Sequence, residues 1–313
     1  MIAAPRFRRF RLSHEDRRNL RTALPFIGPW IIGFLAFTVY PIIYSLYLSF
    51  TNYSGFGDAT AAGFDNYRHL VKDPLFWQSL SNTLYYTALA VPIGVVVAIA
   101  LALMMNQNVR EVAIYRAAFY LPSIIPLFAL TFSFIVLLNP GFGLIDFLLE
   151  RVGLPAVNWL GDARWTRLSV VLLAQLGAGG PALIFLAGLR AVPSELYESA
   201  LLDGAGALRR FYRITLPLIT PVILFDLIYG TILGIQIFTP AFVLAGGTSG
   251  GGAYTAGPEN SLLFYVFYLY KNAFQYSDMG YASAMAWVLF VISVVLALAI
   301  MRWSRYWVHY EVS

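Results

Sequence analysis

The side chains that could carry out chemistry are few in this chain of 313 residues, and their spacing argues against covalent catalysis. The three histidines, His14, His69 and His309, are far apart and form no HExxH pair. Neither a GxSxG nucleophile turn nor a GxxxxGK[ST] phosphate loop occurs, and the absence of cysteine excludes thiolate metal sites and disulfides. The sequence therefore predicts no catalytic residue, no metal site and no ATPase activity of its own.

One polar series lies within an apolar stretch. Asp226, Tyr229, Leu233 and Gln236 follow one another at spacings of three, four and three, which places them on one face of a helix. An acidic side chain at the centre of a membrane helix costs about 2.5–3.5 kcal/mol on insertion scales, so Asp226 should face protein or water. Two interpretations stay open: Asp226 pairs with a neighbouring subunit, or it lines a solute pathway.

The composition is that of a membrane protein. Hydrophobic residues make up 59% of the chain, charged residues 12%, and the mean hydropathy is +0.69, whereas soluble chains are about half apolar and a quarter charged. A bilayer core needs about 20 apolar residues per helix. The sequence predicts an all-α, polytopic membrane protein of about six transmembrane helices, near residues 24–50, 82–105, 117–138, 168–189, 216–238 and 283–301.

Basic residues predict the orientation. If both termini share one side, 15 of the 21 Lys and Arg residues lie on that side, mostly in the N-terminal tail and the loop 190–213. The other six are divided among 51–81, 139–167 and 239–282. Because basic residues collect in cytoplasmic loops, we expect both termini and the loops 106–116 and 190–213 in the cytoplasm. This explains the net charge of +5 without a nucleic-acid partner.

Proline and glycine interrupt the pattern in two ways. Prolines recur inside the apolar stretches, and these fit either ordinary kinks or helices broken around a solute pathway: Pro92, Pro122, Pro126, Pro181, Pro217 and Pro221. The segment 239–282 contains GGTSGGGAYTAG at 246–257. That composition cannot build a core and predicts a flexible surface loop.

The segment 193–221 predicts a helix, a turn and a second helix on the cytoplasmic side. Ser194 is expected to cap the first helix, with Glu195 and Glu198 in its first turn, where the helix dipole favours anions. Gly204 is a natural stop, since glycine adopts positive φ without steric cost. Small residues around the turn would let another surface approach closely: Ser199, Ala200, Ala205 and Gly206.

Taken singly, these residues fit a plain connector whose basic side chains, Arg209, Arg210 and Arg213, only set orientation. As a spaced set they resemble the cytoplasmic loop of permease subunits of binding-protein-dependent ABC importers. That pattern is Glu-Ala-Ala, three residues, Gly, nine residues, Ile, one residue and Leu-Pro. Ser199 replaces its first alanine, and the other positions are in register: Glu198, Ala200, Gly204, Ile214, Leu216 and Pro217.

The resemblance covers nearly the whole chain and is closest to the carbohydrate-uptake branch, of the maltose and glycerol-phosphate permease type. The segments that carry it are YPIIYSLYLSF, FDNYRHLVKDPLFWQSLSNTLYY, NWLGD, IFLAGLRAVPSELYESALLDGA and MGYASAMAWVLFVI, in that order. Thr248 stands where the branch usually has proline, and Gly177 stands where it often has tryptophan. These departures bear on the shape of the solute.

The resemblance implies a type I ABC importer permease fold in a bacterial or archaeal inner membrane. Its partners would be a second permease subunit, two ATPase subunits that bind ATP and Mg²⁺, and an extracytoplasmic solute-binding protein. Gln236 is the first candidate for the solute pathway, ahead of Asp226 and Tyr229. The residues that couple to the ATPase would be Glu195, Glu198, Ser199, Ala200, Asp203, Gly204 and Ala205.

On this interpretation the chain has three parts. A basic cytoplasmic tail, 1–21, precedes a transmembrane permease domain, 22–304, and a cytoplasmic C-terminus, 305–313. The permease domain contains the coupling loop 193–217 and the outer loop 239–282.

Two other classes fit less well. An intramembrane enzyme lacks its catalytic motifs, as described above. An ion- or proton-driven transporter normally has several charges within the membrane and internal repeats, whereas Asp226 is the one acid in the apolar stretches. Copurification with an ATPase would separate an importer subunit from both.

Overall fold

The computed structural model describes residues 14–247 and 256–309, and within them the predicted all-α architecture is confirmed. The strands found there are the two-residue segments β1 (Thr51–Asn52) and β2 (Thr60–Ala61), which pair antiparallel. The longer helices are α1 (His14–Phe34), α2 (Tyr40–Leu48), α3 (Asp65–Lys72), α4 (Pro74–Met105), α5 (Val112–Ile124), α6 (Leu127–Leu137), α7 (Leu144–Arg151), α8 (Ala163–Leu176), α9 (Gly179–Ala191), α10 (Ser194–Leu202), α13 (Thr220–Ile235), α14 (Thr239–Gly247), α15 (Tyr265–Tyr270) and α16 (Met279–Ser304).

Short helices and π-helical turns join these elements: Leu35–Val39, α11 (Ala207–Arg210), Phe211–Thr215, α12 (Leu216–Leu218), Pro258–Asn260 and Lys271–Gln275. Three continuous helices are long and apolar enough to cross a membrane: Thr22–Leu48, α4 and α16. Three further candidates are bent pairs: α5 with α6 at 98°, α8 with α9 at 49°, and Ala207–Leu218 with α13 at 63°. Counting each bent pair as one span gives the six predicted spans.

The bends show which open interpretation of the prolines applies. Ile125 and Pro126 take extended backbone angles between α5 and α6, so Pro126 lies at a broken helix. Pro92 and Pro122 instead lie inside α4 and α5. The break between α8 and α9 falls at glycine and alanine, 177–178, so the prolines did not predict it.

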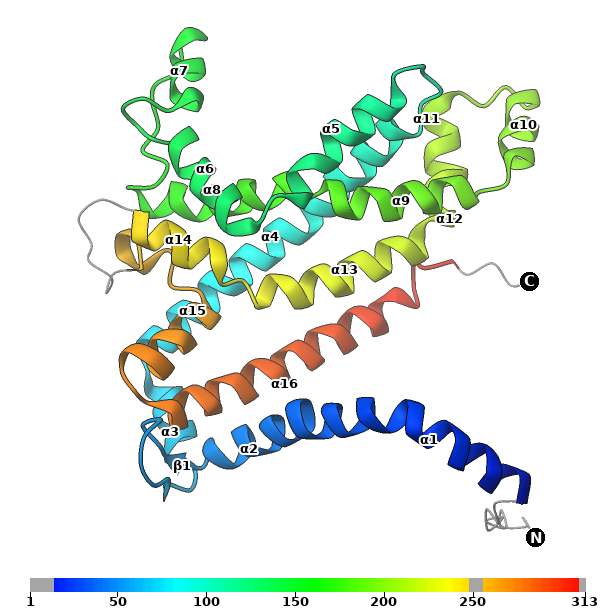
Figure 1. Cartoon of the computed structure of the whole chain (residues 1–313). Helices are drawn as coiled ribbons and strands as arrows, with labels where there is room; N and C mark the ends of the chain where they lie inside the picture. The colour runs from blue at the N-terminus through cyan, green and yellow to red at the C-terminus, as the bar shows by residue number, and fades with distance from the viewer. Residues whose placement is uncertain (1–13, 248–255, 310–313) are drawn as a thin grey trace.

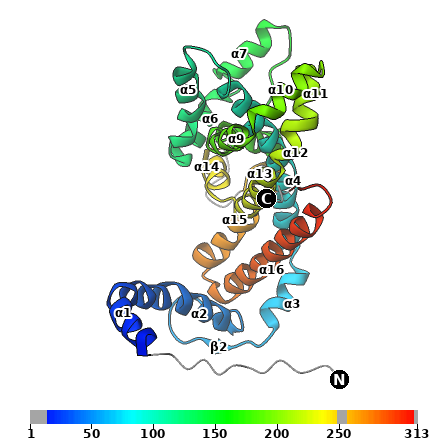
Figure 2. The ribbon, with the colours of Figure 1, turned by 90° about the vertical axis from the view of Figure 1, so that its right-hand side faces the viewer.

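The connections between the long helices lie in two groups, at opposite ends of the molecule (Figure 1). At one end, called the α10 end, lie the start of α1, the end of α16, the turn between α4 and α5, and α10. At the other, called the α3 end, lie β1, α3 and α15. Figure 2 shows that α1 and α2 lie at the edge of the molecule, with α16 between them and the remaining helices. The start of α1, the end of α16 and the connections 106–111 and 190–213 thus lie at one end, while which end faces the cytoplasm stays a prediction.

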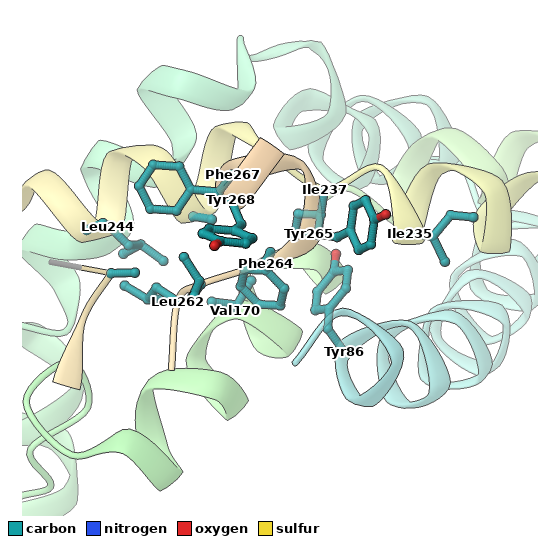
Figure 3. Packing of buried hydrophobic residues seen from close by; sticks show 14 of the residues in the cluster. Tyr86, Val170, Ile235, Ile237, Leu244, Leu262, Phe264, Tyr265, Phe267 and Tyr268 are labelled. Atoms are coloured by element: carbon teal, nitrogen blue, oxygen red, sulfur yellow. The ribbon is translucent and has the colours of Figure 1, made fainter. Parts of the chain in front are cut away.

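The buried side chains form two clusters, both packed on α4. Towards the α3 end, α4 packs with α8 and α15, and the cluster is rich in aromatic side chains such as Tyr86, Phe264 and Tyr265 (Figure 3). Towards the α10 end, Ala98, Ala102 and Met105 of α4 pack against α9. α4 is thus the helix around which the bent pairs are arranged.

The structure corrects the prediction for 239–282. That segment is not a plain outer loop, because α14 packs against α6, and Leu262 and Phe264 are fully buried. Within the glycine-rich tract 246–257, Ala256 is also fully buried, so its flanks join the core. The middle of the tract, 248–255, lies outside the described residues, as do 1–13 of the basic tail.

A buried carboxylate joins three elements at the α3 end. Asp73 Oδ2 accepts hydrogen bonds from the hydroxyls of Tyr268 (2.6 Å) and Tyr281 (2.8 Å), while Oδ1 accepts from Leu75 N (2.9 Å) at the start of α4. Burial and the hydrogen bond to Asp73 raise the pKa of Tyr268, so its hydroxyl stays protonated and donating at neutral pH. The carboxylate therefore holds α15 and α16 against the first turn of α4.

Asp73→Ala tests this junction. It removes the acceptor of two buried hydroxyls, each of which costs about 1–3 kcal/mol when left without a partner. We expect the Asp73→Ala protein in detergent to unfold at a lower temperature than the parent. Unfolding is measured as the temperature at which the monodisperse peak on size-exclusion chromatography is lost. Asp65→Ala is the control, since it breaks only the exposed ion pair with Arg68. Equal thermal stability of the two variants would contradict the proposed role of Asp73.

Candidate functional site

The turn after α10 has the geometry of a Schellman motif. Gly204 has φ +73°, its N–H donates to Leu201 O at 3.0 Å, and the N–H of Ala205 donates to Ala200 O at 2.9 Å. A Cβ on Gly204 would meet no atom within 4 Å. The predicted positive φ is therefore confirmed, and the requirement for glycine comes from the backbone and not from packing within this chain.

The start of α10 differs from the prediction. Ser194 is the first helical residue and makes no capping bond, and Pro193 occupies the cap position. Glu195 lies in the first turn as predicted, whereas Glu198 lies one turn later, so the helix dipole acts on Glu198 less directly. Proline fits this place because its fixed φ suits a helix start and its missing N–H costs nothing there.

α10 projects from the rest of the chain. None of its residues is buried, and Leu202 at its end is 90% exposed. One side-chain bond fixes it to the following segment, from the hydroxyl of Tyr197 to Thr215 Oγ1 (2.8 Å). The predicted coupling residues are all on this helix and its turn: Glu195, Glu198, Ser199, Ala200, Asp203, Gly204 and Ala205. The helix α10 and its turn therefore present exposed small and acidic side chains.

A cavity of about 490 Å³ lies among α4, α8, α9 and α13. Its lining is mostly apolar, with Tyr86 and Val95 from α4 and Gly177 and Ala178 from the break between α8 and α9. The break stays close to α5 because Gly179 has no side chain: a Cβ there would overlap the carbonyl oxygen of Phe119. The cavity thus lies where a helix is interrupted.

The cavity brings together only part of the predicted polar series. Asp226, Leu233 and Gln236 line it, with Gln236 at the C-terminal end of α13. Asp226 is 8% exposed, and among the described residues its side chain makes no hydrogen bond or ion pair. Tyr229 does not line the cavity: it is 52% exposed and stacks on Phe225. Tyr229 therefore lies outside the cavity that Asp226 and Gln236 share, and its place in the solute pathway stays a prediction.

Sequence reasoning missed Gln175, which lines the same cavity beside the break. Its Nε2 donates to Val171 O at 2.8 Å, while its Oε1 is buried without a hydrogen-bond partner. A buried amide oxygen without a partner is an unsatisfied acceptor, here on a residue of the cavity wall. A lone amide inside an apolar stretch, two residues before Gly177, was the signal in the sequence.

These features define a class of protein. A polytopic all-α membrane subunit encloses a cavity at broken helices and exposes a helix and turn at one end, an arrangement suited to solute passage controlled by a partner. The family model described as the binding-protein-dependent transport system inner membrane component matches residues 90–309. The chain belongs to this family, and the predicted permease identity is confirmed.

Individual relatives agree with this family. The chain is 40% identical over 304 residues to the probable ABC transporter permease protein YesP of Bacillus subtilis, covering 96% of this chain and 95% of the relative. It is 31% identical over 286 residues to the sulfoquinovosyl glycerol transport system permease protein SmoG of Agrobacterium fabrum, covering 90% of each.

Solved structures show the same fold. A bacterial ABC transporter that imports the acidic polysaccharide alginate matches with a TM-score of 0.79 and 25% identity, over 93% of this chain and 97% of that chain. A second structure of an alginate ABC transporter, with an alginate pentasaccharide-bound periplasmic protein, has the same TM-score and identity and covers 93% and 96%. The predicted type I importer permease fold is confirmed.

Cysteine accessibility tests which residues face the cavity. The chain has no native cysteine, so Gln236→Cys and Tyr229→Cys each introduce a single thiol. We expect a small, water-soluble thiol reagent to modify position 236 about tenfold faster or more, because the reaction needs a hydrated thiolate and Tyr229 lies outside the cavity. Equal rates, or faster reaction at 229, would reverse the assignment.

Proposed function

We propose that this chain forms half of the transmembrane pathway of an ATP-driven importer for a sugar or related solute. It couples that pathway to a separate ATPase through the loop 193–217. The observation that carries the coupling role is the exposed Schellman turn at Gly204, which none of the residues that the structure describes covers. The small, exposed residues Ser199 and Gly206 leave room for a partner surface to approach the turn.

The solute class is proposed from the relatives and from the cavity. One relative is named a sulfoquinovosyl glycerol transport system permease protein, and one similar structure is an ABC transporter involved in the import of alginate. Both of these solutes carry sugar hydroxyls. Gln236 and Gln175 supply amide groups that can donate to and accept from hydroxyls, while Tyr86 and the apolar wall offer contact to sugar carbons. Asp226 is the second polar candidate of the pathway.

The assembly that this function requires has several chains. A second permease subunit completes the pathway, two ATPase subunits bind ATP and Mg²⁺, and an extracytoplasmic binding protein delivers the solute. This chain contributes no cofactor of its own. The periplasmic protein bound to the alginate transporter supports a delivery partner at the α3 end.

The proposed setting is a bacterial or archaeal inner membrane. Both termini and the α10 end lie in the cytoplasm, with 1–21 as a basic tail, 22–304 as the permease domain and 305–313 as the C-terminus. The domain keeps 239–282 on the outer side.

Gly204→Val and Glu198→Lys test the coupling role. Valine at positive φ costs roughly 1–2 kcal/mol and redirects the chain after α10, while lysine reverses a charge on its exposed surface. Both positions lie outside the spans, so we expect membrane levels near those of the parent. Uptake should be lost, and the ATPase rate of the assembled complex should no longer respond to solute-loaded binding protein.

The chain offers a matched control for the glycine. Gly153 also has positive φ (+78°) and open space around its Cβ position, but it follows α7, away from α10. Gly153→Val should leave ATPase stimulation near the parent value. Full transport by Gly204→Val and Glu198→Lys would remove the support for coupling through this loop.

Orientation is tested by single cysteines in the same cysteine-free chain. Asp58→Cys, in the exposed segment between β1 and β2, should react with a membrane-impermeant maleimide on intact cells. Ala200→Cys should react only after the cells are opened, because 15 of 21 basic residues place its end inside. Labelling of position 200 on intact cells would overturn the proposed sidedness.

A further inference from the structure

A basic hollow lies between α10 and the segment that leads into α13. It has a volume of about 330 Å³ and is lined by Arg209, Arg210 and Arg213, with Ala200, Asp203, Ala205 and Ile214 completing its wall. Three arginines against one aspartate leave a formal charge of +2 in the hollow. The positive-inside tendency accounts for arginines near this end, but it does not account for their convergence on one hollow.

The guanidinium groups of the hollow lack acidic partners. Across residues 14–247 and 256–309, the ion pair found is Arg68–Asp65 at the other end of the molecule, so Asp203 pairs with none of the three arginines. Arg210 Nε is buried and has no hydrogen-bond partner. A buried N–H without an acceptor is unfavourable, and a guanidinium fork matches carboxylate or phosphate oxygens in a bidentate manner.

The hollow lies on a segment with the character of a membrane interface. Residues Ala207–Leu218 meet α13 at 63° and lie at the α10 end of the spans (Figure 1). Leu208 is 71% exposed and Tyr212 is 58% exposed on this segment. Basic residues alternating with exposed apolar and aromatic side chains are typical of helices that lie in the headgroup region.

An apolar groove begins immediately after the hollow along the chain. It has a volume of about 410 Å³ and is lined by side chains of α12, α13 and the end of α16, including Leu216, Leu227, Trp303 and Trp307. Trp307 Nε1 is buried without a hydrogen-bond partner. One residue, Thr215, separates Ile214 of the hollow from Leu216 of the groove.

We propose that the hollow and the groove together bind an anionic phospholipid. Arg209, Arg210 and Arg213 receive the headgroup phosphate, and an acyl chain occupies the groove beside Trp303 and Trp307. The charge of the hollow favours an anion, and the apolar groove that follows it along the chain favours an amphiphile over a soluble anion or the carboxylate of a partner protein. This proposal does not depend on the identity of the imported solute.

The experiment titrates the full-length protein, in its assembled complex, with dioleoylphosphatidylglycerol and dioleoylphosphatidylcholine, and counts bound lipids by native mass spectrometry. We expect the parent to prefer phosphatidylglycerol. The double variant Arg210→Gln with Arg213→Gln should lower the affinity for phosphatidylglycerol about 30-fold. This corresponds to about 2 kcal/mol, at about 1 kcal/mol for each basic residue near a membrane surface. Phosphatidylcholine binding should change little.

Two further variants separate charge from geometry. Arg110→Gln with Arg190→Gln removes two exposed arginines from the same end that line neither the hollow nor the groove, so lipid binding should stay near the parent value. Arg210→Lys with Arg213→Lys keeps the charge but loses the bidentate fork, and its affinity should fall between the parent and the glutamine variant. If the glutamine pair does not fold, the lysine pair carries the same comparison.

Three results would overturn the proposal. Unchanged phosphatidylglycerol binding in the Arg210 and Arg213 variants would exclude the hollow. Competition by inorganic phosphate or glycerophosphoglycerol as strong as that by intact lipid would assign the hollow to a soluble anion. If the Arg210 and Arg213 variants lose the ATPase from the complex while lipid binding is unchanged, the hollow binds a carboxylate of the ATPase instead.

Discussion

The structure depends on the requirement that every peptide N–H and C=O within hydrocarbon finds a partner in the protein. Continuous helices such as α4 and α16 meet that requirement by themselves. Three candidate spans do not, because they bend by 98°, 49° and 63° at breaks of a few residues. Leu127, just after one break, and Gly177, at another, line the cavity. Irregular backbone at membrane depth is tolerated where it faces a cavity, so the breaks and the cavity are parts of one arrangement.

The helix α4 makes hydrogen bonds to neighbouring segments at both ends of the molecule, and these bonds stabilise the broken helices around it. At the α3 end, Asn82 Nδ2 donates to Asn260 O and Leu263 O, and Thr83 Oγ1 accepts from the backbone N–H of Tyr265. At the α10 end, the guanidinium of Arg116 donates to Met105 O, the last carbonyl of α4. Asn82 and Thr83 of α4 thus satisfy backbone groups of the segment around 260–265, and Arg116 of α5 in turn satisfies the last carbonyl of α4.

The sequence predicted most of the architecture because apolar length and charge asymmetry are strong signals in membrane proteins. The turn at Gly204 was also predictable, since the residue spacing and the preference for positive φ agree. The position of Tyr229 outside the cavity was not predictable, because an apolar helix has no hydrophobic period that marks its buried face. The packed segment 256–275 was missed because its run of nine apolar residues, 262–270, is too short for a span. Its aromatic sequence, SLLFYVFYLY, was the signal that could have revealed the core of Figure 3.

The two parts of the site are joined by rigid elements. α9 begins at the break that lines the cavity and ends two residues before α10 starts. α13 begins next to α12, beyond the turn at Gly204, and ends at Gln236 in the cavity wall. At about 1.5 Å per residue, the 13 residues of α9 span about 20 Å and the 16 of α13 about 24 Å. The helix α10 is therefore connected to the cavity along two paths: through α9 on one side and, across the 63° bend before α13, through α11, α12 and α13 on the other.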